Sequence, residues 1–215
     1  IAAAAPSFKE KDKMLIAWYE REIKKYPITL HLNTEVNGIE TLQVDEVIVA
    51  TGAKAKKLPV AGAEYAMDAV EYLLGEKEVG ENVTIVGGGL TGCEIAYDLY
   101  QQGKKPTIVE MKNDLIAVKG VCLANSSYLR DFFTTNHVPV HLETKLSEIH
   151  PDGVTVTDKA GKSFKIEADS VILSVGYDPA PAAAEGKHVH VIGDAKAVGN
   201  LRTVIWNAWD VAMRI

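Results

Sequence analysis

Apolar residues recur along the chain with two spacings, and together these spacings predict an α/β fold. Short apolar runs rich in β-branched residues predict buried strands, whereas apolar residues three and four positions apart predict amphipathic helices. The predicted strands occupy residues 28–32, 47–50, 83–86, 107–109, 138–142, 171–175 and 188–192. The predicted helices occupy residues 8–26, 65–74, 93–102, 125–135 and 201–215. Three further runs, 146–150, 154–157 and 164–166, are separated by turns and predict a small antiparallel meander.

The ends of two predicted helices carry capping signals. Ser7 is expected to cap the first helix, with Glu10 three residues later completing a capping box. Asn125 or Ser126 is expected to cap the helix that runs to residue 135. Pro27 is expected to end the first helix, because proline cannot continue the hydrogen-bond ladder.

Aromatic and histidine side chains in these elements are interpreted as packing residues. The aromatic stripe of the first helix, which includes Trp18 and Tyr19, is expected to lie in the core rather than to stack on a ligand. The same structural role is expected for His31 and His141 on their strands. Trp206 and Trp209 of the last helix are expected in an interface or in the core.

An internal repeat links the two halves of the chain. Residues 28–36 resemble residues 138–146, and residues 45–52 resemble residues 169–176, in the same order. The second copy is longer where it carries the predicted meander. The alternative is that any two α/β stretches look alike, but two ordered matches favour duplication. The counterpart of residues 83–110 would then precede Ile1, so the first copy is expected to lack that unit here.

Composition and charge exclude several classes of function. The 215 residues are 47% hydrophobic and 24% charged, as in globular proteins, and allow one large or two small domains. The net charge of −6 argues against nucleic acid as a partner. Two cysteines without metal-ligand spacing predict a reduced, cytoplasmic setting and no metal site. No apolar run is long enough for a membrane helix, and the missing initiator Met indicates that residue 1 is not the natural start.

A glycine-rich stretch between the strand at 83–86 and the next helix predicts a dinucleotide site. Residues 87–92 read G-G-G-L-T-G and contain the pattern G-x-G-x-x-G. In this pattern Gly87 makes the tight turn, Gly89 lets a pyrophosphate approach the backbone, and Gly92 lets the helix pack closely on the sheet. Gly88, Leu90 and Thr91 complete the turn, and the helix N-terminus offers N–H groups and a positive dipole end. A plain βαβ turn is the alternative.

Glu110 ends the next strand and is expected to accept hydrogen bonds from the ribose of the nucleotide. Its spacing from the glycines fits the carboxylate of NAD-binding sites. A carboxylate there repels the 2′-phosphate of NADPH, so NADH is the expected ligand. Lys112 is assigned to the same site and is the residue that would partly neutralise such a phosphate. Cys93, in the first turn of the helix, is interpreted as a small packing residue rather than as a redox thiol.

These motifs, together with A-T-G at 50–52, V-G at 175–176 and V-I-G-D at 191–194, resemble the two-dinucleotide flavoproteins. A-A-A-P-S-F-K-E at 3–10 and G-D-A-K at 193–196 are similar to the C-terminal half of NADH:flavin oxidoreductases of the 2,4-dienoyl-CoA reductase and enoate reductase type. The resemblance implies an α/β fold with two Rossmann-like dinucleotide-binding domains, each with a three-layer ββα architecture. The FAD domain would be truncated at its N-terminus and interrupted by the NAD(P)H domain, with ranges 1–78, 79–184 and 185–215.

The resemblance also implies cofactors and residue roles. FAD would lie beside Ala50, Thr51, Gly52 and Gly176, and Gly193 and Asp194 would hold its ribityl chain; the alternative for Asp194 is a capping role in its turn. Asn200 and Arg202 stand at the start of the last helix, whose N-terminus would face the flavin. The alternative for either residue is a capping or surface role only. In this family a barrel with FMN and an iron–sulfur cluster precedes these domains, and that barrel or a second copy of the chain is the expected protein partner.

Two functions therefore stand at this point. The first is an electron-entry module that passes hydride from NADH to FAD in an enzyme reducing an activated C=C bond. The second is a module that only binds a nicotinamide dinucleotide or serves as a structural subunit. The absent second glycine turn favours the second function for these residues, and Asp194 with A-T-G favours the first.

Overall fold

A parallel five-stranded sheet forms the centre of the best-packed region. The computed structural model describes residues 1–118 and 120–215. In this part of the chain the strand order is β3-β10-β4-β5-β6, and every neighbouring pair is parallel. The strands are β3 (Met67–Asp68), β4 (Asn82–Val86), β5 (Lys105–Val109), β6 (Val140–His141) and β10 (Ser170–Leu173). Their apolar residues are buried on both faces, which is typical of a parallel sheet.

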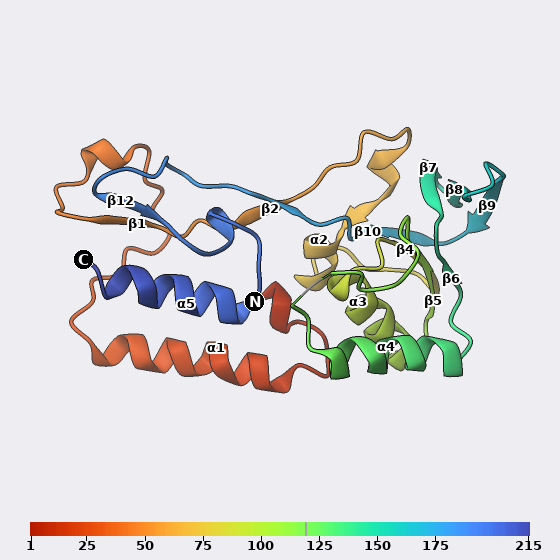
Figure 1. Ribbon diagram of the computed structural model, residues 1–215, viewed down its shortest axis with the longest axis horizontal. Helices are drawn as coiled ribbons and strands as arrows, with labels where there is room; N and C mark the ends of the chain where they lie inside the picture. Colours follow the sequence, from red (N-terminus) through yellow and green to blue (C-terminus); the bar gives the residue numbers. More distant parts are fainter. Residues whose placement is uncertain (119) are drawn as a thin grey trace. The chain divides into compact units, whose positions relative to one another are not determined.

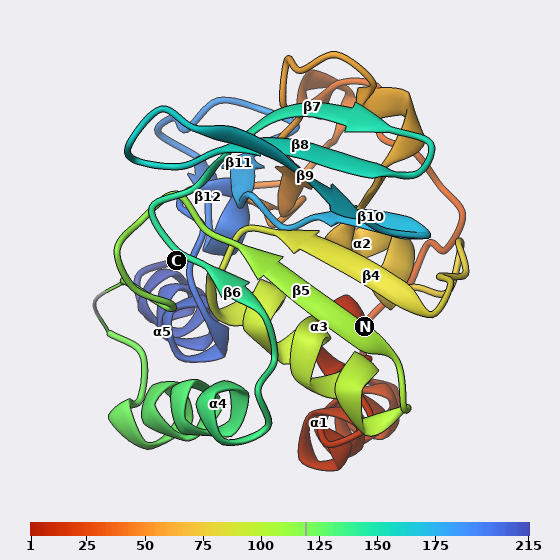
Figure 2. The ribbon, with the colours of Figure 1, turned by 90° about the vertical axis from the view of Figure 1, so that its right-hand side faces the viewer.

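Helices cover one face of this sheet. They are α2 (Ala69–Leu73), α3 (Leu90–Gln101) and α4 (Leu123–Thr135). In Figure 2, α3 and α4 are seen below the strands. Ile85, Ile108 and Ile172 point to this side and pack with Leu99 and Phe133, all at most 1% exposed. The N-cap of α4 is Cys122, so neither Asn125 nor Ser126 caps it. The helix begins earlier than expected, and the Ser126 hydroxyl donates to the Leu123 carbonyl inside it.

An antiparallel meander covers the other face. It consists of β7 (Lys145–His150), β8 (Gly153–Thr157) and β9 (Ser163–Glu167), paired in that order. Val86, Val109 and Val171 of the central sheet pack against Val154 and Val156 of the meander. Meander, sheet and helices form the three ββα layers that the resemblance implies, and the predicted meander is confirmed (Figure 2).

The first 26 residues differ from the expectations for them. They form η1 (Ala2–Ala4), α1 (Glu10–Glu22) and η2 (Ile23–Lys25). Lys9, not Ser7, is the N-cap of α1, because Ser7 donates through both its backbone N–H and its hydroxyl to Asp98 on α3. Trp18 and Tyr19 are about half exposed, so the aromatic stripe of α1 is not part of a core.

A smaller set of strands is built from residues 27–56 and 177–215. β1 (Val47–Val49) pairs in parallel with β12 (Val189–Val191), and β2 (Ala53–Ala55) pairs antiparallel with β11 (Tyr177–Pro179). The turn η5 (Gly193–Ala195) follows β12, and α5 (Leu201–Ala212) follows η5. Buried Val49, Val191 and Ala195 form the small core, and Trp206 and Trp209 are exposed on α5.

The strand predicted at residues 28–32 is absent, which corrects the sequence prediction. These residues form no strand, and Ile28, Leu30 and Leu32 are exposed. The reason is physical: a strand needs a neighbour to receive its backbone hydrogen bonds, and no described segment pairs with this one. His31, expected to be packed, is therefore exposed as well.

The contacts divide the chain into two compact units. The first unit comprises Ile1–Tyr26 and Lys57–Gly176, and the second unit comprises Pro27–Lys56 and Tyr177–Ile215. Figure 1 shows these ranges by colour along the chain. The division differs from the sequence ranges 1–78, 79–184 and 185–215, because residues 1–26 and 57–78 group with the residues that carry the five-stranded sheet. Within them, η4 (Ala63–Tyr65) contacts β7 of the meander. Among the described residues no helix is long and apolar enough to cross a membrane.

Candidate dinucleotide site

The glycine turn of residues 87–92 connects β4 to α3 in the first unit. Gly87 has φ = +110°, and a Cβ on it would lie 2.2 Å from the Ser174 carbonyl oxygen at the end of β10. A Cβ on Gly92 would lie 2.0 Å from the Gly87 carbonyl oxygen. Both positions therefore require glycine, one for the turn and one for close packing of the helix on the strand.

The middle of the turn leaves room for a ligand. Gly89 is the N-cap of α3, and no heavy atom lies within 4 Å of the position that its Cβ would take. Since glycine has no side chain, no capping side chain occupies the helix N-terminus. Leu90 and Thr91 form its first turn and are half-buried. An open helix N-terminus of this kind fits the pyrophosphate of a dinucleotide.

The carboxylate of Glu110 lies against this turn. Its side chain follows β5 and accepts hydrogen bonds from the Gly88 N–H at 2.6 Å and the Lys112 N–H at 2.8 Å. Only 8% of Glu110 is exposed. The structure thus brings Glu110 and the glycine turn together, as the spacing predicts. The Lys112 ammonium group lies 3.5 Å from the Ala117 carbonyl oxygen.

A loop without a predicted role folds back over the turn. Ile116 donates its N–H to the Gly88 carbonyl at 2.7 Å, and Leu115 and Ile116 are buried. Arg130 of α4 holds the loop through Asp114 at 2.9 Å and through the Leu115 carbonyl. The signal available in the sequence was the apolar run at 115–118, which follows the polar residues 112–114.

Cys93 is a packing residue, as expected. It is fully buried, and its thiol donates weakly to the Gly88 carbonyl at 3.5 Å. Burial raises its pKa to about 12, so the thiol is neutral at physiological pH. Cys122 is an exposed free cysteine. In the part of the chain that the structure describes, no three His, Cys, Asp or Glu side chains converge as metal ligands.

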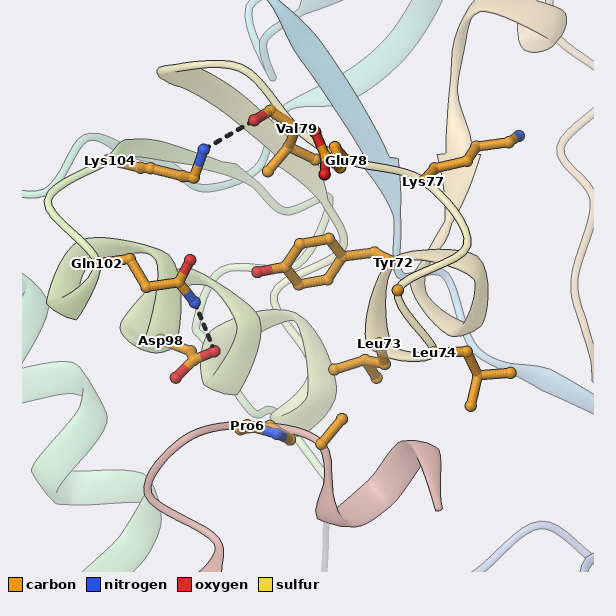
Figure 3. Close-up of a pocket in the computed structure, with 12 residues that line it drawn as sticks. Pro6, Tyr72, Leu73, Leu74, Lys77, Glu78, Val79, Asp98, Gln102 and Lys104 are labelled. Atoms are coloured by element: carbon orange, nitrogen blue, oxygen red, sulfur yellow. Dashed lines mark hydrogen bonds between the residues drawn. The ribbon is translucent and has the colours of Figure 1, made fainter.

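A pocket of about 440 Å³ lies near the other end of α3 (Figure 3). Several of its polar side chains already have partners in the protein: Gln102 donates to Asp98 at 2.9 Å, and Lys104 donates to the Val79 carbonyl at 2.7 Å. Burial raises the pKa of Tyr72 in its wall. The pocket is therefore distinct from the glycine turn, and its internally bonded groups give no reason to place a cofactor there.

The residues assigned to FAD lie in the second unit, except Gly176, which ends the first with φ = +96°. Thr51 donates to the Ala180 carbonyl at 2.8 Å and accepts the Ala182 N–H at 3.0 Å, so its hydroxyl binds the chain itself. The next residue, Gly52, has φ = +77°, and Ala50 before it is exposed.

The turn of residues 193–194 and the start of α5 lie in the same unit. Gly193 has φ = +59°, and one oxygen of Asp194 accepts the Gly199 N–H at 3.0 Å. Asn200 caps α5 through the Thr203 N–H, and Arg202 is exposed. The polar groups of Asp194 and Asn200 thus bind the chain's own backbone. A second glycine turn for the pyrophosphate of FAD is not present among residues 1–215.

Comparisons with known proteins agree with this geometry. The sequence profile of the family described as pyridine nucleotide-disulphide oxidoreductase matches residues 29–212. All of the chain aligns with 33% of a cinnamate reductase from Clostridium sporogenes at 35% identity, and with 35% of an NADH oxidase from Thermoanaerobacter brockii at 32% identity. Among solved structures, a 2-naphthoyl-CoA reductase complex superposes with a TM-score of 0.88 and 26% identity, covering all of this chain and 34% of that one.

The chain thus spans about a third of the length of these relatives. The matched residues include the glycine turn, Glu110 and Asp194. The chain belongs to the pyridine nucleotide-disulphide oxidoreductases, a family of oxidoreductases that bind FAD and NAD(H).

Proposed function

We propose that the first unit binds NADH, with its pyrophosphate on the turn of residues 87–92 and its adenosine ribose on Glu110. The observation that carries this proposal is the contact of Glu110 with the Gly88 N–H at 2.6 Å, beside the open helix N-terminus at Gly89. This contact places the N–H donors that a pyrophosphate needs next to the carboxylate acceptor that ribose hydroxyls need.

NADH is preferred over NADPH in this proposal. Two backbone N–H groups hold the Glu110 carboxylate in place, and it is nearly buried, so it cannot turn away from a 2′-phosphate. A fixed anion beside a second anion is unfavourable, and more so where solvent screening is weak. Lys112 is the residue that would oppose this preference, and its ammonium group lies toward Ala117.

The proposed role of the second unit is to hold FAD through Gly193, Asp194, Asn200 and the strand end at 50–52, with Gly176 beside the cofactor. When bound, the flavin supplies a group that accepts hydride from the nicotinamide. The chain's own residues bind and orient the two cofactors. We propose further that the longer protein reduces an activated C=C bond, with FMN and an iron–sulfur cluster in its other part and these domains working beside that part or a second copy. The names of the cinnamate and 2-naphthoyl-CoA reductases support this.

A second candidate function is a module that binds only the nicotinamide dinucleotide. It is favoured by the second unit, where β1 and β12 form a sheet of only two strands and residues 28–32 are exposed. This arrangement leaves little to hold the pyrophosphate of FAD.

Titration of the 215-residue chain with NADH and NADPH tests the first part of the proposal. NADH fluorescence should change on binding, with a lower dissociation constant than for NADPH; tighter NADPH binding would contradict the role of Glu110. Absorbance in the flavin bands tests the second part. Retained FAD that NADH bleaches under anaerobic conditions supports the electron-entry module, whereas NADH binding without any uptake of added FAD supports the binding module.

A further inference from the structure

Three consecutive residues before α1 contact side chains of helix α3. Ser7 bonds Asp98, the ring of Phe8 meets Tyr97 edge-on with centroids 5.0 Å apart, and the Lys9 ammonium group lies 2.7 Å from Glu94. We call residues 5–9 the strap. Pro6 of the strap also forms a wall of the pocket beside Asp98 (Figure 3). The strap therefore runs along α3, the helix whose N-terminus forms the candidate pyrophosphate site.

The Lys9–Glu94 pair is largely removed from water. The side chains of Lys9 and Glu94 are 18% and 15% exposed, respectively. In every other salt bridge of the described ranges, at least one side chain is 32% exposed or more. Burial of an ion pair costs desolvation energy, and stabilisation alone is a weak reason for one. The pair is therefore expected to have an electrostatic role beyond stabilising the fold.

That role follows from the place of Glu94 on α3. It is the fifth residue of the helix, about 6 Å along the axis from Leu90 at a rise of about 1.5 Å per residue. An unneutralised carboxylate there opposes the positive end of the helix dipole as a pyrophosphate approaches. The ammonium group of Lys9 cancels this charge at a distance of 2.7 Å.

We propose that Lys9 is a positioning residue that neutralises Glu94 and so keeps the N-terminus of α3 attractive to the dinucleotide pyrophosphate. This inference rests on the proposed NADH site. It assigns to the strap, which lies outside the glycine motif, a part in setting dinucleotide affinity.

The protonation of Glu94 makes the effect of Lys9 on dinucleotide affinity depend on pH. A role of Lys9 in packing alone would not have this pH dependence. Burial raises the pKa of Glu94, and Lys9 opposes that rise. The charged groups facing it are Lys9 and Asp12, both from the start of α1, and Asp98 lies one turn further along α3. Without Lys9 the pKa of Glu94 rises further, because Asp12 and burial both disfavour its charge. Lowering the pH then neutralises Glu94 by protonation and restores dinucleotide affinity.

The test is a set of four variants of the 215-residue chain titrated with NAD⁺, which tolerates acid, at pH 8 and pH 6. Lys9→Met should raise the dissociation constant at pH 8 by roughly fifteenfold, the Coulomb effect of one unit charge about 10 Å away at an effective dielectric constant near 20. The increase should shrink at pH 6. Glu94→Gln should bind as well as the unsubstituted chain or better, and Lys9→Met/Glu94→Gln should return to within about twofold of it.

Lys13→Met is the matched control, since Lys13 is an exposed lysine in the first turn of α1, four residues after Lys9, and its loss changes the net charge equally. It should bind normally. Circular dichroism of each variant checks folding. The inference is overturned if Lys9→Met binds NAD⁺ normally, or if Glu94→Gln binds it more weakly than the unsubstituted chain. It is also overturned if the double variant binds as weakly as Lys9→Met at both pH values. No binding by the unsubstituted chain overturns the proposed NADH site, and this inference with it.

Discussion

Two stretches of similar sequence meet different surroundings in the two units. Residues 138–142 contain β6, which pairs with β5 at the edge of the five-stranded sheet, whereas residues 28–32 form no strand. Ile172 of β10 is fully buried between β3 and β4, while Ile48, its counterpart in the repeat, is 44% exposed. An apolar pattern thus predicts a tendency, and only a neighbour with free backbone groups turns that tendency into a buried strand.

Truncation of Ile172 and of its repeat counterpart Ile48 should reveal the largest difference in stability between the two units. Ile172→Ala should lower the free energy of unfolding by about 2–5 kcal/mol, because it leaves a cavity among packed strands. Ile48→Ala should cost less than about 1 kcal/mol, since its side chain is already half in water. Urea unfolding followed by circular dichroism measures both. Equal losses would show that the second unit is as well packed as the first.

Glycine substitutions separate the need for a turn from the need for ligand space. Gly89→Ala should leave stability within about 1 kcal/mol, because nothing lies near the new methyl group and only the cap is altered. Dinucleotide affinity should nevertheless fall at least about tenfold, or about 1.4 kcal/mol. NADH titration beside thermal unfolding checks this. Gly92→Ala is the contrasting variant and should lose stability too, since its methyl group meets the Gly87 carbonyl. Normal NADH binding by Gly89→Ala would remove the pyrophosphate from this turn.

The second unit has its own ligand prediction. In the longer protein, Asp194→Ala should weaken FAD binding by about 1.5–3 kcal/mol through loss of a charged acceptor. NADH binding, assigned to the first unit, should change little. Flavin content after gel filtration and NADH titration of the same sample give the two values. Equal loss of both cofactors would indicate a folding defect instead.

Acid should weaken the second unit slightly through Glu46. Hydrogen bonds from His188 and then His190, at 2.9 and 2.8 Å, lower the pKa of Glu46. A carboxyl group with a lowered pKa stabilises the fold above its unfolded pKa and loses that contribution as the pH falls through its folded pKa. Glu46→Gln should therefore be less stable than the unsubstituted chain at pH 7, and the difference should vanish as the pH falls through the lowered pKa of Glu46. Melting temperatures of both proteins, measured across this pH range, test the prediction. A difference that stays constant with pH would show that the charge of Glu46 is not its cause.

The sequence predicted the parts whose causes are local. The spacing of Gly87, Gly89 and Gly92 and the place of Glu110 follow from rules for one βαβ unit, and the structure brings these residues together. The packing role of Cys93 also follows from its helix face. The parts that were missed depend on distant partners. Ser7 bonds Asp98 instead of capping α1, and no local pattern reveals that competition.

The order of strands has a consequence for synthesis of the chain. β10 is the last strand of the five-stranded sheet to be made, yet it lies between β3 and β4, which begin about 100 and 90 residues earlier in the sequence. While the ribosome adds those residues, the facing edges of β3 and β4 stay without partners. Their closure is a non-local step that comes late and is slow to form. We expect nascent chains that stop before residue 170 to be recognised by chaperones far more than chains that have passed residue 173.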